Sequence, residues 1–397
     1  MKLLFVLKGS ALNRGMNTGI ENLAWQLAEY GADVHILTGG SQPEKHGYRF
    51  PANVTYYFTG GNGMLGDHIA LYKQLRHKQH FDAVIGWIRN IRPLAFLEPI
   101  GSRRPRFVAN EGQTMKSAIF AGMRSRLRAF ASTLIKGNHQ LIKSALLRTK
   151  KINGVQIDKV VAISRAVKAN VETVYSLPDD RVTVIPRGVD TEFYYLSDDK
   201  NLDTLSDPPR MLFSGNIKKT KGLGDVAEAL AMVKQPVEWV LCGKDQGYLQ
   251  ELQANIENQD IAHRLTWAGT LYPEELRIQL QYADCFVFCS WSEVQTGGGW
   301  GEGLGKSLLE AMSCGLPVIV SNIAAFRDVV VDRENGLIVP VNDPQSIAEA
   351  INTYLNDPEL RIRCGVNARK TIMRTFNKQA EATAWINLLN EQIEKGQ

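Results

Sequence analysis

Negative charge is missing from one long stretch of this 397-residue chain. From Gly112 to Ile157 there is no Asp or Glu, although the whole chain carries 41 acidic and 46 basic residues. The stretch holds Lys116, Arg124, Arg126, Arg128, Lys136, Lys143, Arg148, Lys150 and Lys151. A block of one charge sign usually reflects a partner or a solvated face, so the segment 112–157 needs an explanation.

Long hydrophobic runs are absent too. No run of about 18 apolar residues occurs, so the sequence predicts no membrane-spanning helix. The apolar segment Lys2–Lys8 is too short and too soon interrupted by charge to be a signal peptide.

Cysteine is scarce and confined to the second half of the chain. None of the five cysteines lies beside a histidine at metal-ligand spacing, and Cys285 and Cys289 fall at or near a predicted buried strand. We therefore expect structural thiols in a reduced, cytoplasmic compartment and no metal site.

The basic segment 112–157 also contains a helical pattern. Apolar residues recur at helical spacing, at Ile119, Met123, Leu127, Phe130 and Leu134. One interpretation is a long helix packed on a sheet with its basic face in solvent. The alternative is a surface that meets anionic lipid head groups or an anionic acceptor. No zinc-finger or RNA-binding motif accompanies the charge, so we expect no nucleic-acid partner.

The first half of the chain alternates short apolar runs with helical segments, which predicts βαβ units and a parallel sheet. Strands are expected at Leu3–Leu7, Val34–Thr38, Val54–Phe58, Ala83–Trp87, Phe107–Ala109, Val160–Ile163 and Val182–Pro186. Helices are expected at Gly19–Tyr30, Asp67–Lys78, Arg92–Pro99 and Arg165–Tyr175. A polar, acidic segment over 196–209 ends in two prolines and is predicted to be a linker.

A second alternating series follows the linker. Strands are expected at Met211–Phe213, Trp239–Cys242, Leu265–Trp267, Cys285–Cys289, Val318–Val320 and Leu337–Val339. Helices are expected at Gly224–Lys234, Tyr248–Asn258, Glu274–Gln281, Lys306–Met312, Ile347–Asn356 and Lys378–Lys395. The sequence thus predicts two doubly wound α/β domains, over 1–195 and 210–375, with a C-terminal helix over 376–397 that crosses back onto the first. Ligands of such sheets bind beyond the carboxyl ends of the strands, so we expect a cleft between the domains.

Two loops of the second domain are suited to phosphate. The turn Gly303-Leu304-Gly305 feeds a helix, whose N-terminus presents unpaired N–H groups and a positive dipole end. Glu302 precedes that helix and Glu310 lies inside it, so the two carboxylates could reach opposite ends of one ligand. A capped surface helix with a solvated Glu is the alternative.

The second phosphate-suited loop, Gly215–Gly222, brings Lys218, Lys219 and Lys221 after another strand. Three solvated lysines are the plain alternative. Both loops follow strands of one sheet at the same edge, and their convergence favours a diphosphate ligand.

Several motifs, in this order along the chain, resemble the retaining glycosyltransferases of the GT-B fold, family 4. They are Gly188-Val189-Asp190, Gly215-x5-Lys221-Gly222, Ala268-Gly269, Ser290-Trp291-Ser292-Glu293, Glu302-x7-Glu310 and Val339-Pro340-x-x-Asp343-Pro344. The resemblance implies transfer of a sugar, of the hexosyl type, from a nucleotide diphosphate-sugar such as a UDP-sugar. It also implies retained anomeric configuration, no required metal and no cofactor.

The resemblance assigns roles position by position. Lys221 and the N–H groups of Gly303, Leu304 and Gly305 would hold the donor diphosphate, together with Gly215 and Asn216. Glu310 would bind the ribose, Glu302 the transferred sugar, and Gly19 would face the diphosphate from the first domain.

The sequence departs from the family pattern in four places. Asn216 stands where an arginine is usual, which leaves Lys218 or Lys219 to supply the missing charge. Thr18 replaces the glycine that usually pairs with Gly19. Glu111 stands where a histidine is common, so we expect it to bind sugar as one of the catalytic residues, with Glu302 and Lys221. The glycine-rich segment 294–301 is an insertion, either a mobile lid or acceptor platform, or an ordered loop without substrate contact.

Other functions fit two doubly wound domains. A dinucleotide dehydrogenase needs Gly-x-Gly-x-x-Gly after its first strand, which the segment Lys8–Gly19 does not supply. A sugar-nucleotide epimerase is a further alternative. A phosphorylase would need a cofactor-bearing lysine, which nothing in the sequence indicates. A non-catalytic sugar-nucleotide-binding partner remains open. We expect a glycan or glycolipid acceptor of lipopolysaccharide, capsule or exopolysaccharide synthesis, at the inner face of the cytoplasmic membrane. A small cytosolic acceptor is the alternative.

Liposome flotation tests the lipid interpretation of segment 112–157. We expect the protein to float with anionic vesicles and not with neutral ones, because basic side chains are attracted to anionic head groups. Binding to both kinds of vesicle alike, or to neither, would contradict it.

Overall fold

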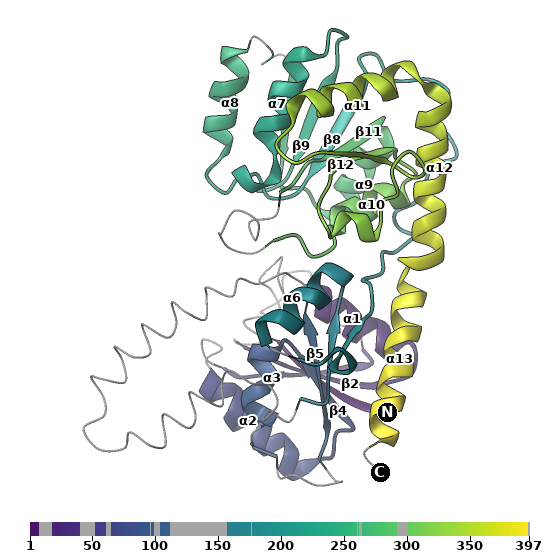
Figure 1. Cartoon of the computed structure of the whole chain (residues 1–397). Helices are drawn as coiled ribbons and strands as arrows, with labels where there is room; N and C mark the ends of the chain where they lie inside the picture. The colour runs from purple at the N-terminus through teal and green to yellow at the C-terminus, as the bar shows by residue number, and fades with distance from the viewer. Residues whose placement is uncertain are drawn as a thin grey trace, which may run out of the picture. The chain divides into compact units, whose positions relative to one another are not determined.

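The structure is a computed structural model that describes residues 1–7, 18–39, 52–60, 65–95, 97–98, 104–111, 157–175, 177–259, 261, 264–291 and 301–395 (Figure 1). Contacts divide the chain into two compact units. The first comprises Met1–Pro186 and Glu381–Gln397, and the second comprises Arg187–Ala380. The basic segment 112–157, except Ile157, and the insertion 294–301, except Gly301, lie outside the described residues.

The first unit is built on a seven-stranded parallel sheet with the order β3-β2-β1-β4-β5-β6-β7. The strands are β1 (Lys2–Val6), β2 (Asp33–Thr38), β3 (Val54–Phe58), β4 (Ala83–Gly86), β5 (Arg106–Glu111), β6 (Lys159–Ala162) and β7 (Val182–Val184). The central strands are buried along almost their whole length, as parallel strands covered on both faces must be.

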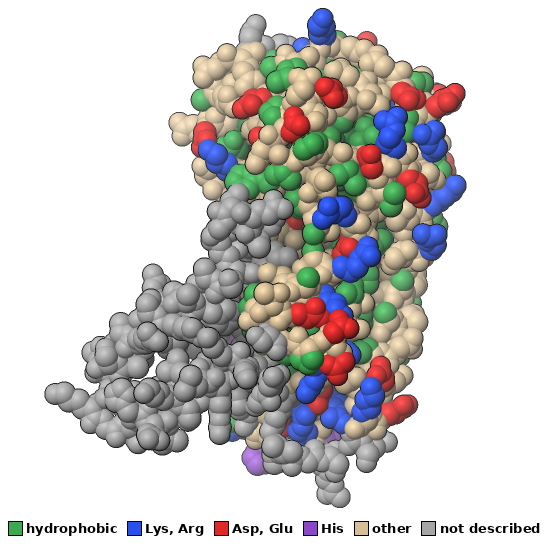
Figure 2. All heavy atoms as spheres, viewed as in Figure 1, with side chains coloured by type: hydrophobic (Ala, Val, Ile, Leu, Met, Phe, Trp, Pro, Cys, Tyr) green, Lys and Arg blue, Asp and Glu red, His purple; other side chains and the backbone are tan. Residues whose placement is uncertain are grey.

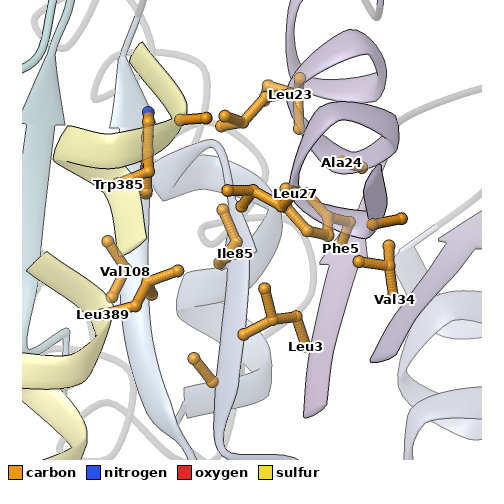
Figure 3. Packing of buried hydrophobic residues seen from close by; sticks show 14 of the residues in the cluster. Leu3, Phe5, Leu23, Ala24, Leu27, Val34, Ile85, Val108, Trp385 and Leu389 are labelled. Carbon is orange, nitrogen blue, oxygen red and sulfur yellow. The ribbon is translucent and has the colours of Figure 1, made fainter. Parts of the chain in front are cut away.

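Helices α1 (Thr18–Glu29), α2 (Leu65–Lys78), α3 (Ile88–Ala95) and α6 (Arg165–Tyr175) accompany this sheet. Helix α13 (Lys378–Glu394) has its residues from Glu381 onward in the same unit. Figure 3 shows Leu27 of α1 against Phe5 of β1, and Trp385 of α13 near Val108 of β5, within one apolar cluster. The two helices therefore share one core, although they lie at opposite ends of the sequence.

The second unit contains a six-stranded parallel sheet with the order β10-β9-β8-β11-β12-β13. Its strands are β8 (Arg210–Ser214), β9 (Glu238–Cys242), β10 (Leu265–Gly269), β11 (Cys285–Phe288), β12 (Val318–Ser321) and β13 (Leu337–Val339). Its helices are α7 (Leu223–Met232), α8 (Leu249–Asn258), α9 (Pro273–Tyr282), α10 (Lys306–Ser313), α11 (Pro344–Asn356) and α12 (Pro358–Thr375). This strand order is that of a doubly wound Rossmann-like sheet.

The structure differs from the sequence prediction in four respects. The third helix spans Ile88–Ala95 instead of Arg92–Pro99. Helix α12 was not predicted at all. The segment 196–209 packs on the second unit, where Lys200 donates to the Ala283 carbonyl and Arg361 to the Leu202 carbonyl (Nη2–O 3.2 Å). The first unit ends at Pro186, whereas the sequence predicted a first domain over 1–195.

The described residues also bear on the cysteines, on membrane-spanning helices and on the surface charge. All five cysteines are free and buried, as expected of structural thiols. Within the described parts of the chain, no helix combines the length and apolarity needed to cross a bilayer. Among the described residues on the face shown in Figure 2, Lys and Arg side chains are interspersed with Asp and Glu.

A substitution of Trp385 tests whether α13 packs on the hydrophobic core of the first unit. The side chain is fully buried, so Trp385→Ala should lower the free energy of unfolding by about 3–5 kcal/mol. Urea denaturation measures this, with Lys395→Ala, an exposed position one residue beyond α13, as control, for which we expect about 0–1 kcal/mol. Equal effects of the two substitutions would contradict the packing of α13 on this core.

Candidate functional site

The candidate site lies at the carboxyl edge of the second sheet. Because all its strand pairs are parallel, β8, β11 and β12 end at the same edge. The loop 215–222 leaves β8, residues 289–291 leave β11, and residues 301–305 lead into α10. These three segments carry most of the residues that the sequence predicted to bind a donor.

The centre of the site is an ion pair between Lys221 and Glu302. The lysine Nζ donates directly to Oε1 of the glutamate and also lies 5.0 Å from the centroid of the Phe288 ring. Only 13% and 17% of the two side chains are exposed. Such a pair is held mainly by Coulomb attraction in a poorly solvated setting, where breaking it leaves an uncompensated charge.

The protonation of Glu302 follows from this environment. Burial is the largest single influence and raises the pKa of Glu302, whereas the charge of Lys221 and its hydrogen bond lower it. A hydrogen bond from Ser290 and the charge of Lys218 act in the same direction. The net result is a pKa below the usual value, so Glu302 is ionised at neutral pH.

The backbone around Lys221 is fixed by a glycine. Lys219–Lys221 form a short 3-10 turn, η3, and Gly222 follows in the left-handed region with φ 66°. A Cβ at Gly222 would clash with the carbonyl oxygen of Cys289, at the end of β11. The amide of Trp291 donates to the Thr220 carbonyl (3.2 Å), so the lysine loop lies directly on the chain that leaves β11. Only glycine allows this approach.

The turn before α10 is a glycine turn at a helix N-terminus. Gly305 is the residue before the helix, with φ 77°, and its Cα faces the rings of Phe326 and Phe288 closely enough that a Cβ would lie 3.0 and 3.2 Å from them. Leu304 is buried, which anchors the turn. The N-terminus of α10 therefore carries its positive dipole end next to Glu302 and the loop of Lys221.

The structure distinguishes the two lysines that could replace the missing arginine. Lys219 pairs with Glu251 (Nζ–Oε1 3.0 Å), and both side chains are largely exposed. Lys218 lies close enough to Glu302 for its charge to lower the pKa of that carboxyl. Asn216 is exposed. It follows Gly215, whose carbonyl oxygen lies so close to Gly243 that a Cβ at Gly243 would clash with it. Lys218 is therefore the better candidate for a second phosphate-binding cation.

Glu310 lies on the second turn of α10 and is almost completely buried. Its Oε1 is 2.9 Å from Nζ of Lys306, one turn earlier. Tyr194 donates a hydrogen bond to the Glu310 carboxylate. Burial and this neighbouring carboxylate raise the pKa of Tyr194. Tyr194 was not predicted from the sequence, because nothing local connects position 194 with position 310.

Ser290 is the other residue whose role the sequence did not indicate. It belongs to the motif Ser290-Trp291-Ser292-Glu293, but only the structure shows its hydroxyl 3.0 Å from Oε1 of Glu302. The sequence did offer one signal for Ser290, since this serine begins the motif and directly follows a predicted buried strand.

Two predicted site residues belong to the first unit. Gly19 is the second residue of α1. Glu111 ends β5 and is buried, and its Oε1 accepts a hydrogen bond from the amide of Ile88 (2.9 Å), the first residue of α3. Glu111 thus stabilises a helix N-terminus, and its role towards a sugar stays a prediction. The structure brings together Lys221, Glu302 and the Gly303–Gly305 turn within the second unit.

Two family models match consecutive parts of the chain. Residues 13–193 match Glycosyltransferase Family 4, and residues 197–371 match Glycosyl transferases group 1. A lipopolysaccharide core biosynthesis glycosyltransferase, LpsE, of Rhizobium meliloti is 28% identical over 48% of this chain and 53% of its own. A D-inositol 3-phosphate glycosyltransferase of Pseudarthrobacter chlorophenolicus is 24% identical over 96% of this chain and 90% of its own.

A solved structure matches over the whole length. Anabaena HepE in complex with UDP-glucose is 18% identical, with a TM-score of 0.72 over 98% of this chain and 100% of that one. By contrast, the chain spans 53–62% of the length of the first four curated relatives it matches.

The fold and the phosphate-suited edge define a two-unit α/β protein of the GT-B class. The chain belongs to glycosyltransferase family 4, and its second half matches the glycosyl transferases of group 1. The predicted fold class and family are therefore confirmed.

Gly222 provides a test of how the lysine loop is built. Gly222→Ala should weaken binding of inorganic pyrophosphate about tenfold or more, because the new Cβ displaces the loop that carries Lys221. Isothermal titration calorimetry gives the affinity. Gly247→Ala is the matched control, since Gly247 is also left-handed (φ 87°) but has open space around it. The control should lose about 1–2 kcal/mol of stability and keep its affinity. Equal affinities in both variants would contradict the assignment.

Proposed function

We propose that this chain is a retaining glycosyltransferase that moves a sugar from a nucleoside diphosphate-sugar to a glycan or lipid-linked acceptor. One observation carries the proposal. In a chain of this family, the buried Lys221–Glu302 pair lies at the sheet edge beside the N-terminus of α10. A cation, a helix dipole and a carboxylate at one place suit a ligand that joins a diphosphate to a sugar.

In the proposed reaction, the bond between the anomeric carbon and the diphosphate oxygen breaks, and a bond to the acceptor oxygen forms. Negative charge grows on the departing diphosphate, where Lys221 and the N–H groups of the Gly303–Gly305 turn stabilise it. The proton of the acceptor hydroxyl passes to the departing phosphate oxygen. No protein base, metal or cofactor is required in this scheme.

The two glutamates have separate parts in the proposed donor site. Glu302 is ionised and adjoins Lys221, which suits it to accept hydrogen bonds from hydroxyls of the transferred sugar. Glu310, one turn after Lys306, accepts hydrogen bonds from the ribose. Before the donor binds, Lys221 is neutralised by Glu302, so an arriving diphosphate competes with the glutamate for the lysine.

The proposed donor and acceptor classes draw support from the relatives. HepE was crystallised with UDP-glucose, which supports a UDP-sugar as the first donor to test. LpsE is named for lipopolysaccharide core biosynthesis, which supports a cell-surface glycan acceptor. The inositol 3-phosphate glycosyltransferase supports the second candidate, transfer to a small acceptor. For a glycolipid acceptor, the basic segment 112–157 would place the enzyme at the cytoplasmic membrane face.

A donor panel tests the proposed function. Thermal shift and release of nucleoside diphosphate are measured with UDP-glucose, UDP-galactose, GDP-mannose and ADP-glucose. Lys221→Ala and Glu302→Ala should each lower kcat/KM about a hundredfold or more, because each removes a charge from the donor site. Lys219→Ala is the matched control and should leave turnover near that of the unaltered chain, since Lys219 pairs with Glu251 on the surface.

The outcomes separate the candidate functions. Turnover unaffected by Lys221→Ala and Glu302→Ala would contradict the site. Donor binding without turnover, with a full panel of acceptor extracts, would favour a non-catalytic binding partner. The anomeric configuration of the product, read by NMR in the presence of EDTA, tests retention and metal independence together.

A further inference from the structure

Ser290 lies between the two segments that carry the charged pair. It is the second residue after β11 and is 1% exposed. Its hydroxyl Oγ is 3.0 Å from Oε1 of Glu302 and 3.1 Å from the carbonyl oxygen of Thr220, the residue before Lys221. The hydroxyl therefore has one acceptor on the glutamate and another on the lysine loop.

A serine hydroxyl carries a single proton and can donate it to one of these acceptors at a time. Its neighbours leave Ser290 little freedom to move away from them. The carbonyl of Ser290 accepts a hydrogen bond from the hydroxyl of Ser321, a buried residue at the end of β12. The amide of Trp291, the next residue, donates to the same Thr220 carbonyl. The backbone is thus fixed on both sides, and only rotation of the hydroxyl remains.

We propose that Ser290 is a positioning residue for donor binding, whose hydroxyl holds the Glu302 carboxylate beside Lys221 and turns to the Thr220 carbonyl when sugar hydroxyls occupy Glu302. The inference rests on the proposed function, because it assigns Glu302 to the sugar. It adds a residue that acts through Glu302 and does not itself touch the donor. Ser321 helps to hold Ser290 in place, because its hydroxyl donates to the Ser290 carbonyl.

The electrostatics of Glu302 make the effect measurable. Among the described residues, the charged groups that act on Glu302 are Lys221 and Lys218, and Ser290 adds a neutral hydrogen bond. Burial raises the pKa of Glu302 and these three groups lower it. Removing the Ser290 hydroxyl should therefore raise the pKa of Glu302. Because Glu302 binds sugar as a carboxylate, donor affinity should then fall off at a higher pH as the solution is acidified.

The direct test measures the ionisation of Glu302 in the full chain. Carboxyl-labelled glutamate gives NMR titration curves, and Glu302 is assigned by its absence from the Glu302→Gln variant. In Ser290→Ala we expect the pKa of Glu302 to rise by about one unit, the size of shift that one lost hydrogen bond to a charged group produces. Ser321→Ala should give a smaller shift in the same direction.

A kinetic test uses the panel donor with the highest turnover. Ser290→Ala should raise its KM about fivefold and move the acid limb of kcat/KM to higher pH by the same shift as the pKa. Tyr354→Phe is the control. This substitution also removes a buried hydroxyl that donates to a main-chain carbonyl, in this case that of Val318 (3.2 Å). Val318 begins β12, whereas Ser321, which contacts Ser290, ends it. It should lower thermal stability and leave the KM and the pH profile unchanged.

Either readout can overturn the inference. An unchanged Glu302 pKa in Ser290→Ala, or equal shifts of KM in Ser290→Ala and Tyr354→Phe, would make Ser290 a packing residue only. If Ser290→Ala does not fold, Ser321→Ala carries the same test. Should no donor be turned over, the proposed function fails, whereas the NMR titration still decides whether Ser290 controls Glu302.

Discussion

The second unit depends on one constraint at its functional edge, which is that Lys221 and Glu302 must meet in a poorly solvated place. Residues far apart in sequence serve this contact. Gly222 lets the lysine loop lie against the end of β11, the Gly305 turn sets Glu302 before α10, and Phe288 lies under the ammonium group. Removing either charge would leave the other buried without compensation, which would destabilise the fold. The pair therefore matters for stability as well as for the proposed binding.

In the proposed donor site, the same contact would select for a ligand that joins a diphosphate to a sugar. A lone phosphate must take Lys221 away from Glu302 and leaves that carboxylate unpaired. A diphosphate-sugar offers a negative group to the lysine and hydroxyl donors to the glutamate, so both partners of the broken pair are satisfied again. The N-terminus of α10 adds a third attractive group at the same edge. On the proposed function, the arrangement would favour the whole donor over its fragments.

The sequence predicted the sheets well, because buried parallel strands form short apolar runs that punctuate the chain. It also predicted that the loops 215–222 and 302–305 follow strands and meet at one sheet edge, because their glycines and lysines are local signals. It could not predict that Lys221 pairs with Glu302, that Ser290 lies between them or that Tyr194 contacts Glu310, because these depend on tertiary contact. Helix α12 was missed because its buried positions include Cys364, Gly365 and Ala368, a stripe of low hydrophobicity, although Asp357-Pro358 was an available start signal.

The most direct measurement is a crystal structure of the full chain with the nucleoside diphosphate-sugar that gives the largest thermal shift. The account predicts that Lys221 contacts diphosphate oxygens, that Glu302 has left the lysine for hydroxyls of the sugar, and that the diphosphate lies at the N-terminus of α10. A complex in which Lys221 and Glu302 remain paired, with the diphosphate bound elsewhere, would contradict the account.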